Sequence, residues 1–197
     1  MEHSSDFPHA RHNLGIMYAN FGKGELAEEN YKKAIEIDAQ FHPARFNLAN
    51  LYNTMGRNKE AEEQLREVIR LVPENGEAHY SLGLLLAEMN RLDEAVYSLK
   101  RAVDLMPDRA RIRYNYALTL SHLGRSEEAL SEMIRAHAAD RRNSGIVQAI
   151  AIFYIQAGEW KKAFPYAKKL VDLEPDAEGP GQMLRQIQQA ISASESR

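Results

Sequence analysis

Hydrophobic residues recur at helical spacing along the chain and form two apolar stripes, and this pair of stripes repeats every 34 residues. In residues 42–75, the first stripe contains Ala44, Leu48, Leu51, Tyr52 and Met55, and the second contains Ala61, Leu65, Val68, Ile69 and Val72. Apolar residues three or four positions apart share one face of an α-helix. The pattern therefore predicts two amphipathic helices of about 13 residues in each period.

Small and helix-ending residues hold fixed places within the period. Alanine occupies one column in five successive units, at Ala27, Ala61, Ala95, Ala129 and Ala163. A second small column contains Gly15, Ala49, Gly83, Ala117 and Ala151, where we expect two helices to cross closely. Between the stripes stand Gly22, Gly56, Asn90, Gly124 and Gly158, residue types that adopt the left-handed turn after a helix. Pro73, Pro107 and Pro175 end the second helix of their units.

These columns divide the chain into five repeats, each a helix-turn-helix unit. The predicted repeats are residues 8–41, 42–75, 76–109, 110–143 and 144–177, after a lead-in at residues 1–7. One helix pair cannot cover its own apolar stripe, so successive pairs must stack on one another. The sequence thus predicts an all-α protein in which the repeats form an array.

The repeat resembles the tetratricopeptide repeat family. The segments ARHNLGIMYANFGKGELAEENYKKAIEID and AHYSLGLLLAEMNRLDEAVYSLKRAVDLMP carry the resemblance. It implies a right-handed α-solenoid, closed by a capping helix, with a concave groove that binds partner proteins. The main departure is the family's tryptophan near the start of each unit, which is replaced here by Arg11, Arg45, His79, Arg113 and Val147.

The two ends of the array differ. In residues 178–197, Pro180 suits a helix start, and a narrow stripe at Met183, Leu184, Ile187, Ala190 and Ile191 predicts a capping helix. We expect Ser192–Arg197 to fray. No such cap precedes the first repeat, which favours either a minimal array or a domain of a longer protein.

Composition excludes several classes of function. The chain has no cysteine, which excludes disulfides, cysteine-ligated metal and covalent haem within it. Its net charge of −3 is too balanced for a general nucleic-acid or membrane-surface binder. No basic leader or apolar run of about 18 residues is present, so we expect no direct membrane insertion and a soluble chain. The compartment stays open, with the cytoplasm as the default.

Catalytic and metal motifs are missing as well. The chain has no glycine-rich phosphate loop, no HExxH motif and no nucleophile elbow. His9 and His12 share a helical face but lack a third ligand, so we predict no metal and no cofactor. Adjacent glutamates such as Glu28 and Glu29 diverge by about 100° on a helix, and we assign them to the helix dipole. The sequence therefore predicts a protein that is not an enzyme.

The resemblance places the ligand site on the first helices of the repeats. It implies that amides read a peptide backbone while aromatic and apolar side chains supply contact area. The predicted contacts are Asn13, Phe46, Asn47, Asn50, Tyr80, Leu84, Arg111, Tyr114 and Asn115. The alternative is structural: the aromatic rings pack between repeats, and the amides bond to the adjacent helix. Some relatives bind the carboxylates of a peptide C-terminus with a clamp of Lys, Asn and Arg from three consecutive repeats. This clamp is absent here, because only Asn50 and Arg111 match its positions.

Three functions follow, and the residues alone do not separate them. The first is a non-enzymatic scaffold that binds a partner segment in its groove. The second is an accessory domain of a bacterial multi-haem c-type cytochrome. The segments HSSDFPHARHNLG and PENGEAHYSLGLLLAEM resemble repeat arrays attached to such cytochromes, and this role would place the chain in the periplasm. The third is self-assembly through the convex or the uncapped N-terminal face, giving a homo-oligomer.

Overall fold

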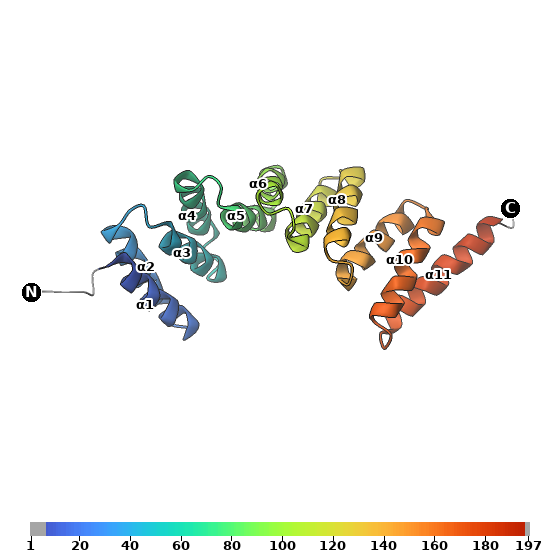
Figure 1. Cartoon of the computed structure of the whole chain (residues 1–197), viewed down its shortest axis with the longest axis horizontal. Helices are drawn as coiled ribbons and strands as arrows, with labels where there is room; N and C mark the ends of the chain where they lie inside the picture. The colour runs from blue at the N-terminus through green and yellow to red at the C-terminus, as the bar shows by residue number, and fades with distance from the viewer. Residues whose placement is uncertain (1–6, 196–197) are drawn as a thin grey trace, which may run out of the picture. The chain divides into compact units, whose positions relative to one another are not determined.

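The computed structural model describes residues 7–195, which fold into eleven helices without a strand (Figure 1). In chain order they are α1 (Pro8–Asn20), α2 (Gly24–Ile37), α3 (His42–Thr54), α4 (Asn58–Leu71), α5 (Gly76–Glu88), α6 (Leu92–Leu105), α7 (Ala110–His122), α8 (Ser126–Ala139), α9 (Ser144–Gln156), α10 (Trp160–Leu173) and α11 (Glu178–Glu195). Helices α1 to α10 contain 13 or 14 residues each, as the stripes predict.

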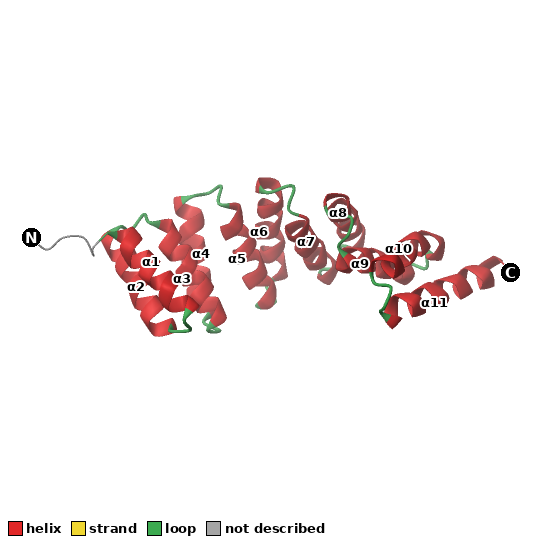
Figure 2. Ribbon diagram, turned by 60° about the horizontal axis from the view of Figure 1, so that its bottom comes forward, coloured by secondary structure: helices red, strands yellow, loops and turns green. Residues whose placement is uncertain are grey.

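The helices form two compact units, Met1–Met106 with α1 to α6 and Pro107–Arg197 with α7 to α11. Within the first unit, α1 packs on α2, α3 on α4 and α5 on α6, and α2 and α4 each contact the following pair (Figure 2). The second unit repeats this scheme with α7 on α8 and α9 on α10, and α11 packs against α10. Consecutive helix pairs of this kind confirm the predicted all-α solenoid fold.

Left-handed turns separate the two helices of every repeat, as the glycine column predicts. Gly22, Gly56, Gly124 and Gly158 have φ values of 70°, 72°, 74° and 71°. Asn90 takes the same conformation with φ of 57°, and asparagine is the residue that tolerates it best after glycine. The turn is therefore fixed locally, and it sends the second helix back against the first.

Small side chains allow the two helices of a repeat to cross closely. The five alanines of the Ala27 column are fully buried, and Ala49, Ala117 and Ala151 are buried at the other column. At Gly15, a Cβ atom would lie 2.5 Å from the ring of Tyr31, and at Gly83 it would lie 2.6 Å from Cγ of Leu99. Both distances are shorter than any normal carbon contact, so these positions require glycine.

Three of the residues in place of the family's tryptophan, Arg45, His79 and Arg113, bond to the loop that precedes their repeat. Arg45 donates a hydrogen bond to the carbonyl oxygen of Ala39 at 3.1 Å, and Arg113 does the same to Pro107 at 3.3 Å. The buried ring of His79 bonds to the carbonyl oxygen of Pro73 at 3.0 Å. All three bonds span six residues, so a polar side chain satisfies a carbonyl of the inter-repeat turn.

Ion pairs join successive repeats of the first unit along α2, α4 and α6. Arg57 bonds to Glu28 of the preceding repeat at 2.6 Å, and Arg91 bonds to Glu62 at 2.6 Å. The hydrogen bonds from Arg57 lower the pKa of Glu28 to about 2. We assigned these glutamates to the helix dipole, but each is also a partner of an arginine 29 residues further along the chain.

The C-terminal helix is longer than the sequence predicts. Helix α11 continues to Glu195, where the hydroxyl of Ser194 donates to the carbonyl oxygen of Ile191 at 2.7 Å. Residues 192–195, which we expected to fray, are therefore helical, and residues 196–197 lie outside the described part. Ile187 is fully buried against Ala163 and Ala167 of α10, so α11 covers the end of the second unit.

Candidate functional site

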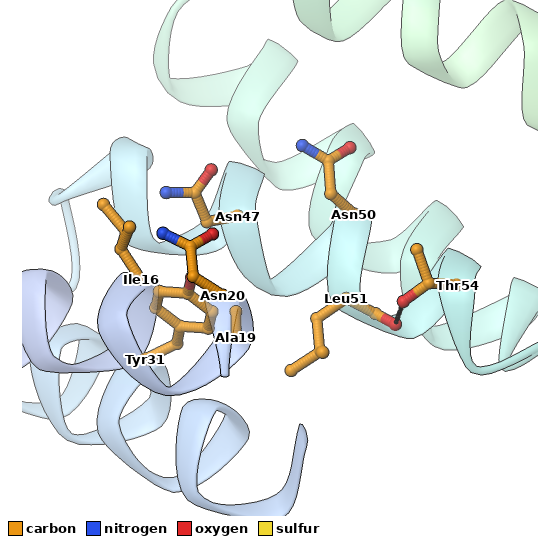
Figure 3. A pocket seen from close by; sticks show the side chains of 8 residues that line it. All are labelled: Ile16, Ala19, Asn20, Tyr31, Asn47, Asn50, Leu51 and Thr54. Atoms are coloured by element: carbon orange, nitrogen blue, oxygen red, sulfur yellow. Dashed lines mark hydrogen bonds between the residues drawn. The ribbon is translucent and has the colours of Figure 1, made fainter. Parts of the chain in front are cut away.

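A hollow of about 460 Å³ opens on the first unit between α1, α2 and α3 (Figure 3). Its lining comes from the facing sides of two successive repeats: Ile16, Ala19, Asn20, Tyr31, Asn47, Asn50, Leu51 and Thr54. The glycine at position 15 lets the ring of Tyr31 on α2 approach α1, where this ring forms part of the lining.

The lining of the hollow is uncharged and combines polar groups with apolar surface. Three carboxamides, from Asn20, Asn47 and Asn50, extend to the same side of the ribbon in Figure 3. The hydroxyl of Thr54 donates to the carbonyl oxygen of Leu51 at 2.7 Å. Ile16, Ala19 and Leu51 add an apolar surface. A carboxamide both donates and accepts hydrogen bonds, so this arrangement suits a neutral ligand with peptide-like groups.

One of these amides is bonded to the neighbouring helix. The Nδ2 group of Asn47 donates to Nε2 of His12 on α1 at 2.7 Å, which leaves the Oδ1 atom of Asn47 as an acceptor. Burial, together with the neighbouring His9, lowers the pKa of His12, so the imidazole is neutral and can accept at neutral pH. The structural alternative, in which the amides bond to the adjacent helix, therefore accounts for the Nδ2 group of Asn47.

The rings of His9 and His12 pack edge-on against the ring of Phe41. Their rings lie 4.6 and 5.3 Å from the ring of Phe41 in edge-on geometry. Within residues 7–195, no group of three or more His, Cys, Asp or Glu side chains converges in a way that could hold a metal ion. Over the same residues, none of the helices has the length and hydropathy needed to cross a membrane.

The predicted contact residues of the first unit do not all meet at the hollow. Asn47 and Asn50 line it, with Asn50 exposed. Asn13 is exposed on α1 but is not part of the lining. Phe46 is half-buried against the core of the unit, as the structural alternative predicts for the aromatic column. Tyr80, half-buried, and Leu84, 37% exposed, lie on α5.

The other three predicted residues lie on α7 in the second unit. Arg111 is exposed, whereas Tyr114 is half-buried against the core cluster around Met133 and Ile146. This burial raises the pKa of Tyr114. Asn115 is half-buried, and its backbone carbonyl accepts a hydrogen bond from Thr119 at 2.9 Å. Packing therefore accounts for the position of Tyr114 without a ligand.

Sequence reasoning missed Asn20 and Thr54. Thr54 stands one helical turn beyond Asn50, and Asn20 stands one turn beyond Ile16, which holds in the first repeat the place of Asn50 in the second. Residues four apart share a helix face, so extending the columns by one turn identifies both. It also missed Tyr31, which comes from the second helix of its repeat, and no spacing along α1 or α3 indicates this contribution.

A second hollow, of about 380 Å³, lies in the second unit between α7, α8 and α9. Its lining is Ser121, Ser126, Glu127, Leu130, Phe153, Gln156, Ala157 and Glu159. This lining has two carboxylates and one carboxamide, whereas the first hollow has three carboxamides and no carboxylate, so the two hollows differ in the ligand chemistry they suit. The first alone has the neutral amide lining that the sequence predicts for a peptide site.

Comparison of the sequence with known families finds the tetratricopeptide repeat at three overlapping stretches, residues 6–74, 46–108 and 86–148. No curated protein matches the chain in sequence.

Solved structures similar to the chain include YrrB, described as a tetratricopeptide repeat protein with an unusual peptide-binding site. It has a TM-score of 0.76 and 24% identity, over 98% of this chain and 94% of its own. MamA from Desulfovibrio magneticus has a TM-score of 0.79 and 19% identity, over 87% and 97%. PilF from Pseudomonas aeruginosa has a TM-score of 0.77 and 22% identity, over 96% and 87%.

Proposed function

Because the chain belongs to the tetratricopeptide repeat family, whose members generally act as non-enzymatic protein-interaction scaffolds, we propose that it binds an extended segment of a partner protein in the hollow of its first unit. The observation that carries the proposal is the uncharged lining of three carboxamides beside Ile16, Ala19 and Leu51. The unusual peptide-binding site named for YrrB supports a peptide ligand for this fold.

The lining indicates what such a segment contains. Extended backbone offers an N–H donor and a carbonyl acceptor at each residue, and Asn20, Asn47 and Asn50 can pair with both. Asn47 offers its Oδ1 atom, because its Nδ2 group already donates to His12. The apolar part of the hollow accepts a side chain of moderate size. We therefore expect a neutral segment with an apolar residue between exposed peptide groups.

A display library of random peptides, selected on the full chain, tests this proposal. Asn50→Lys puts a charged side chain into the hollow, and we expect it to weaken the selected peptides at least roughly tenfold, or about 1.4 kcal/mol. Asn53→Lys is the matched control, because Asn53 is an exposed amide on the same helix outside the lining. The control should bind as the wild type does.

Three results would contradict the proposal. One is that no peptide is enriched on the folded chain. Another is that the selected peptides bind equally well to the wild type and to Asn50→Lys, which would place their site elsewhere. Selected peptides rich in charged residues would also count against a neutral site.

The remaining functional expectations stay predictions. We predict no catalytic activity, since Tyr31 is the single titratable residue that lines the hollow. A role as an accessory domain of a multi-haem cytochrome predicts CxxCH motifs and a signal peptide in the coding sequence ahead of this chain. Reading that sequence tests the role directly.

A further inference from the structure

A row of five apolar side chains at heptad spacing runs along helix α1 and the two residues that flank it, and three of the five are exposed. The row, which we call the α1 seam, contains Phe7, Ala10, Leu14, Met17 and Phe21, at intervals of three, four, three and four residues. Phe7 is 64% exposed, Met17 41% and Phe21 73%, which places them among the most exposed large apolar residues of the described chain. Such spacing aligns Ala10, Leu14 and Met17 along one side of α1, and Phe7 and Phe21 stand at its two ends as the residues that flank the helix.

The same face of the next repeat forms an interface inside the protein. In α3 the corresponding residues are Phe41, Ala44, Leu48, Leu51 and Met55, nearly the same sequence. Leu48 is 2% exposed and Ala44 is fully buried. Leu51 and Met55 lie 3.8 Å from the Cβ position of Gly24, at the start of α2. In the first repeat, Phe7, Met17 and Phe21 of this face are exposed, so the α1 seam has interface chemistry on an exposed surface.

We propose that the α1 seam binds the α1 seam of a second copy of this chain, with the two helices antiparallel. The seam is nearly palindromic about Leu14, because a phenylalanine stands seven residues away on either side. A two-fold axis at Leu14 brings Phe7 opposite Phe21 of the second copy. It also brings the large Met17 beside the small Ala10 of the second copy, so large and small side chains alternate across the interface.

Charge permits this pairing. Helix α1 contains no carboxylate, and its arginine is Arg11, which flanks the seam. In the antiparallel arrangement the two Arg11 positions lie six residues apart along the helix axis, about 9 Å at 1.5 Å per residue. His9 and His12 face Phe41, away from the seam. Arg11 is therefore the one charged side chain of α1 near the contact, and no carboxylate of α1 lies there.

The interface is small. The seam is about 21 Å long, and one helix pair of this length buries less than the roughly 1,200 Å² of a stable, specific complex. The dimer is therefore weak and reversible, and it forms as the protein concentration rises.

Sedimentation equilibrium of the full chain tests the proposal. The average mass should rise from 22.4 kDa toward twice that value as the concentration is raised roughly a hundredfold. Phe21→Glu should hold the mass at that of the monomer. Tyr97→Glu is the matched control, because Tyr97 is a 69% exposed aromatic residue on α6, and it should dimerise like the wild type. Circular dichroism checks that both variants stay helical.

A strict monomer over that range overturns the proposal, and so does a dimer that survives Phe21→Glu. Loss of the dimer in Tyr97→Glu as well would move the interface away from α1. The orientation has its own test, because the chain has no cysteine. Mixed Phe7→Cys and Phe21→Cys chains should form more disulfide with each other than either forms with itself. A preference for the symmetric disulfides would overturn the antiparallel arrangement.

Discussion

Single atoms decide how closely the helices of this protein approach. Where Gly83 crosses α6, an added Cβ atom meets Cγ of Leu99 at 2.6 Å and its backbone nitrogen at 3.1 Å. The neighbour includes backbone, so the contact cannot be relieved by turning a side chain alone. At Gly24 the nearest atoms are 3.8 Å away, which is an ordinary contact. Gly83 and Gly24, in the same unit, therefore differ in the space that a larger residue would find.

Gly83→Ala should therefore lower the free energy of unfolding by about 1–3 kcal/mol, because the added methyl group forces α5 and α6 apart. Gly24→Ala should cost little, since its Cβ atom has room and alanine favours a helix. Urea denaturation followed by circular dichroism compares the two. Equal effects at both positions would show that backbone freedom, rather than the close crossing, makes Gly83 necessary.

At the scale of helices, ion pairs connect neighbouring repeats on the second helix of each pair. The Glu28 side chain is 15% exposed and accepts from Arg57 of the next repeat, from Lys32 and from the hydroxyl of Tyr52. Its pKa of about 2 lies below the ordinary value of 4.5, so folding favours the charged form. This contribution is complete above the ordinary pKa and is lost as the pH falls toward 2.

Glu28→Gln should accordingly destabilise the protein by about 1–3 kcal/mol at pH 7, and the difference from the wild type should shrink between pH 5 and pH 2. Urea denaturation across this pH range measures it. Glu29→Gln is the control, because Glu29 is exposed and pairs with Lys33 within its own helix. A difference that does not change with pH would mean that the glutamine disturbs packing instead of removing a charge.

At the scale of the whole molecule, each of the two units is an array of helix pairs, and a helix at the end of an array exposes the apolar face that a neighbouring pair would bury. Helix α11 covers α10 through Ile187, which is fully buried, and through Met183, Leu184 and Ile191, which are partly buried. Trp160, the single tryptophan of the chain, packs in the same cluster and reports on it. In the first unit, the α1 seam leaves a comparable apolar surface exposed, which is the surface we assign to a second copy.

Ile187→Ala should lower the free energy of unfolding of this unit by about 2–5 kcal/mol, because it removes buried methyl groups and leaves a cavity between α10 and α11. Tryptophan fluorescence during urea denaturation measures the change. Gln188→Ala, at an exposed position of the same helix, should stay within about 0.5 kcal/mol of the wild type. An equally small effect of Ile187→Ala would mean that α11 does not stabilise the array.

The sequence by itself determined the repeat, the helix pairs, the left-handed turns and the small-residue crossings. These features depend on neighbours within one helix or one turn, and the 34-residue period shows each of them five times. It also named Asn47 and Asn50, because both stand on the predicted groove face. Only the tertiary structure decided which side chains from different helices meet. The bond from Asn47 to His12 and the pair of Arg57 with Glu28 join residues 35 and 29 positions apart, and the ring of Tyr31 enters the hollow from a different helix. Such contacts depend on helix separation and rotamer, which periodicity does not specify.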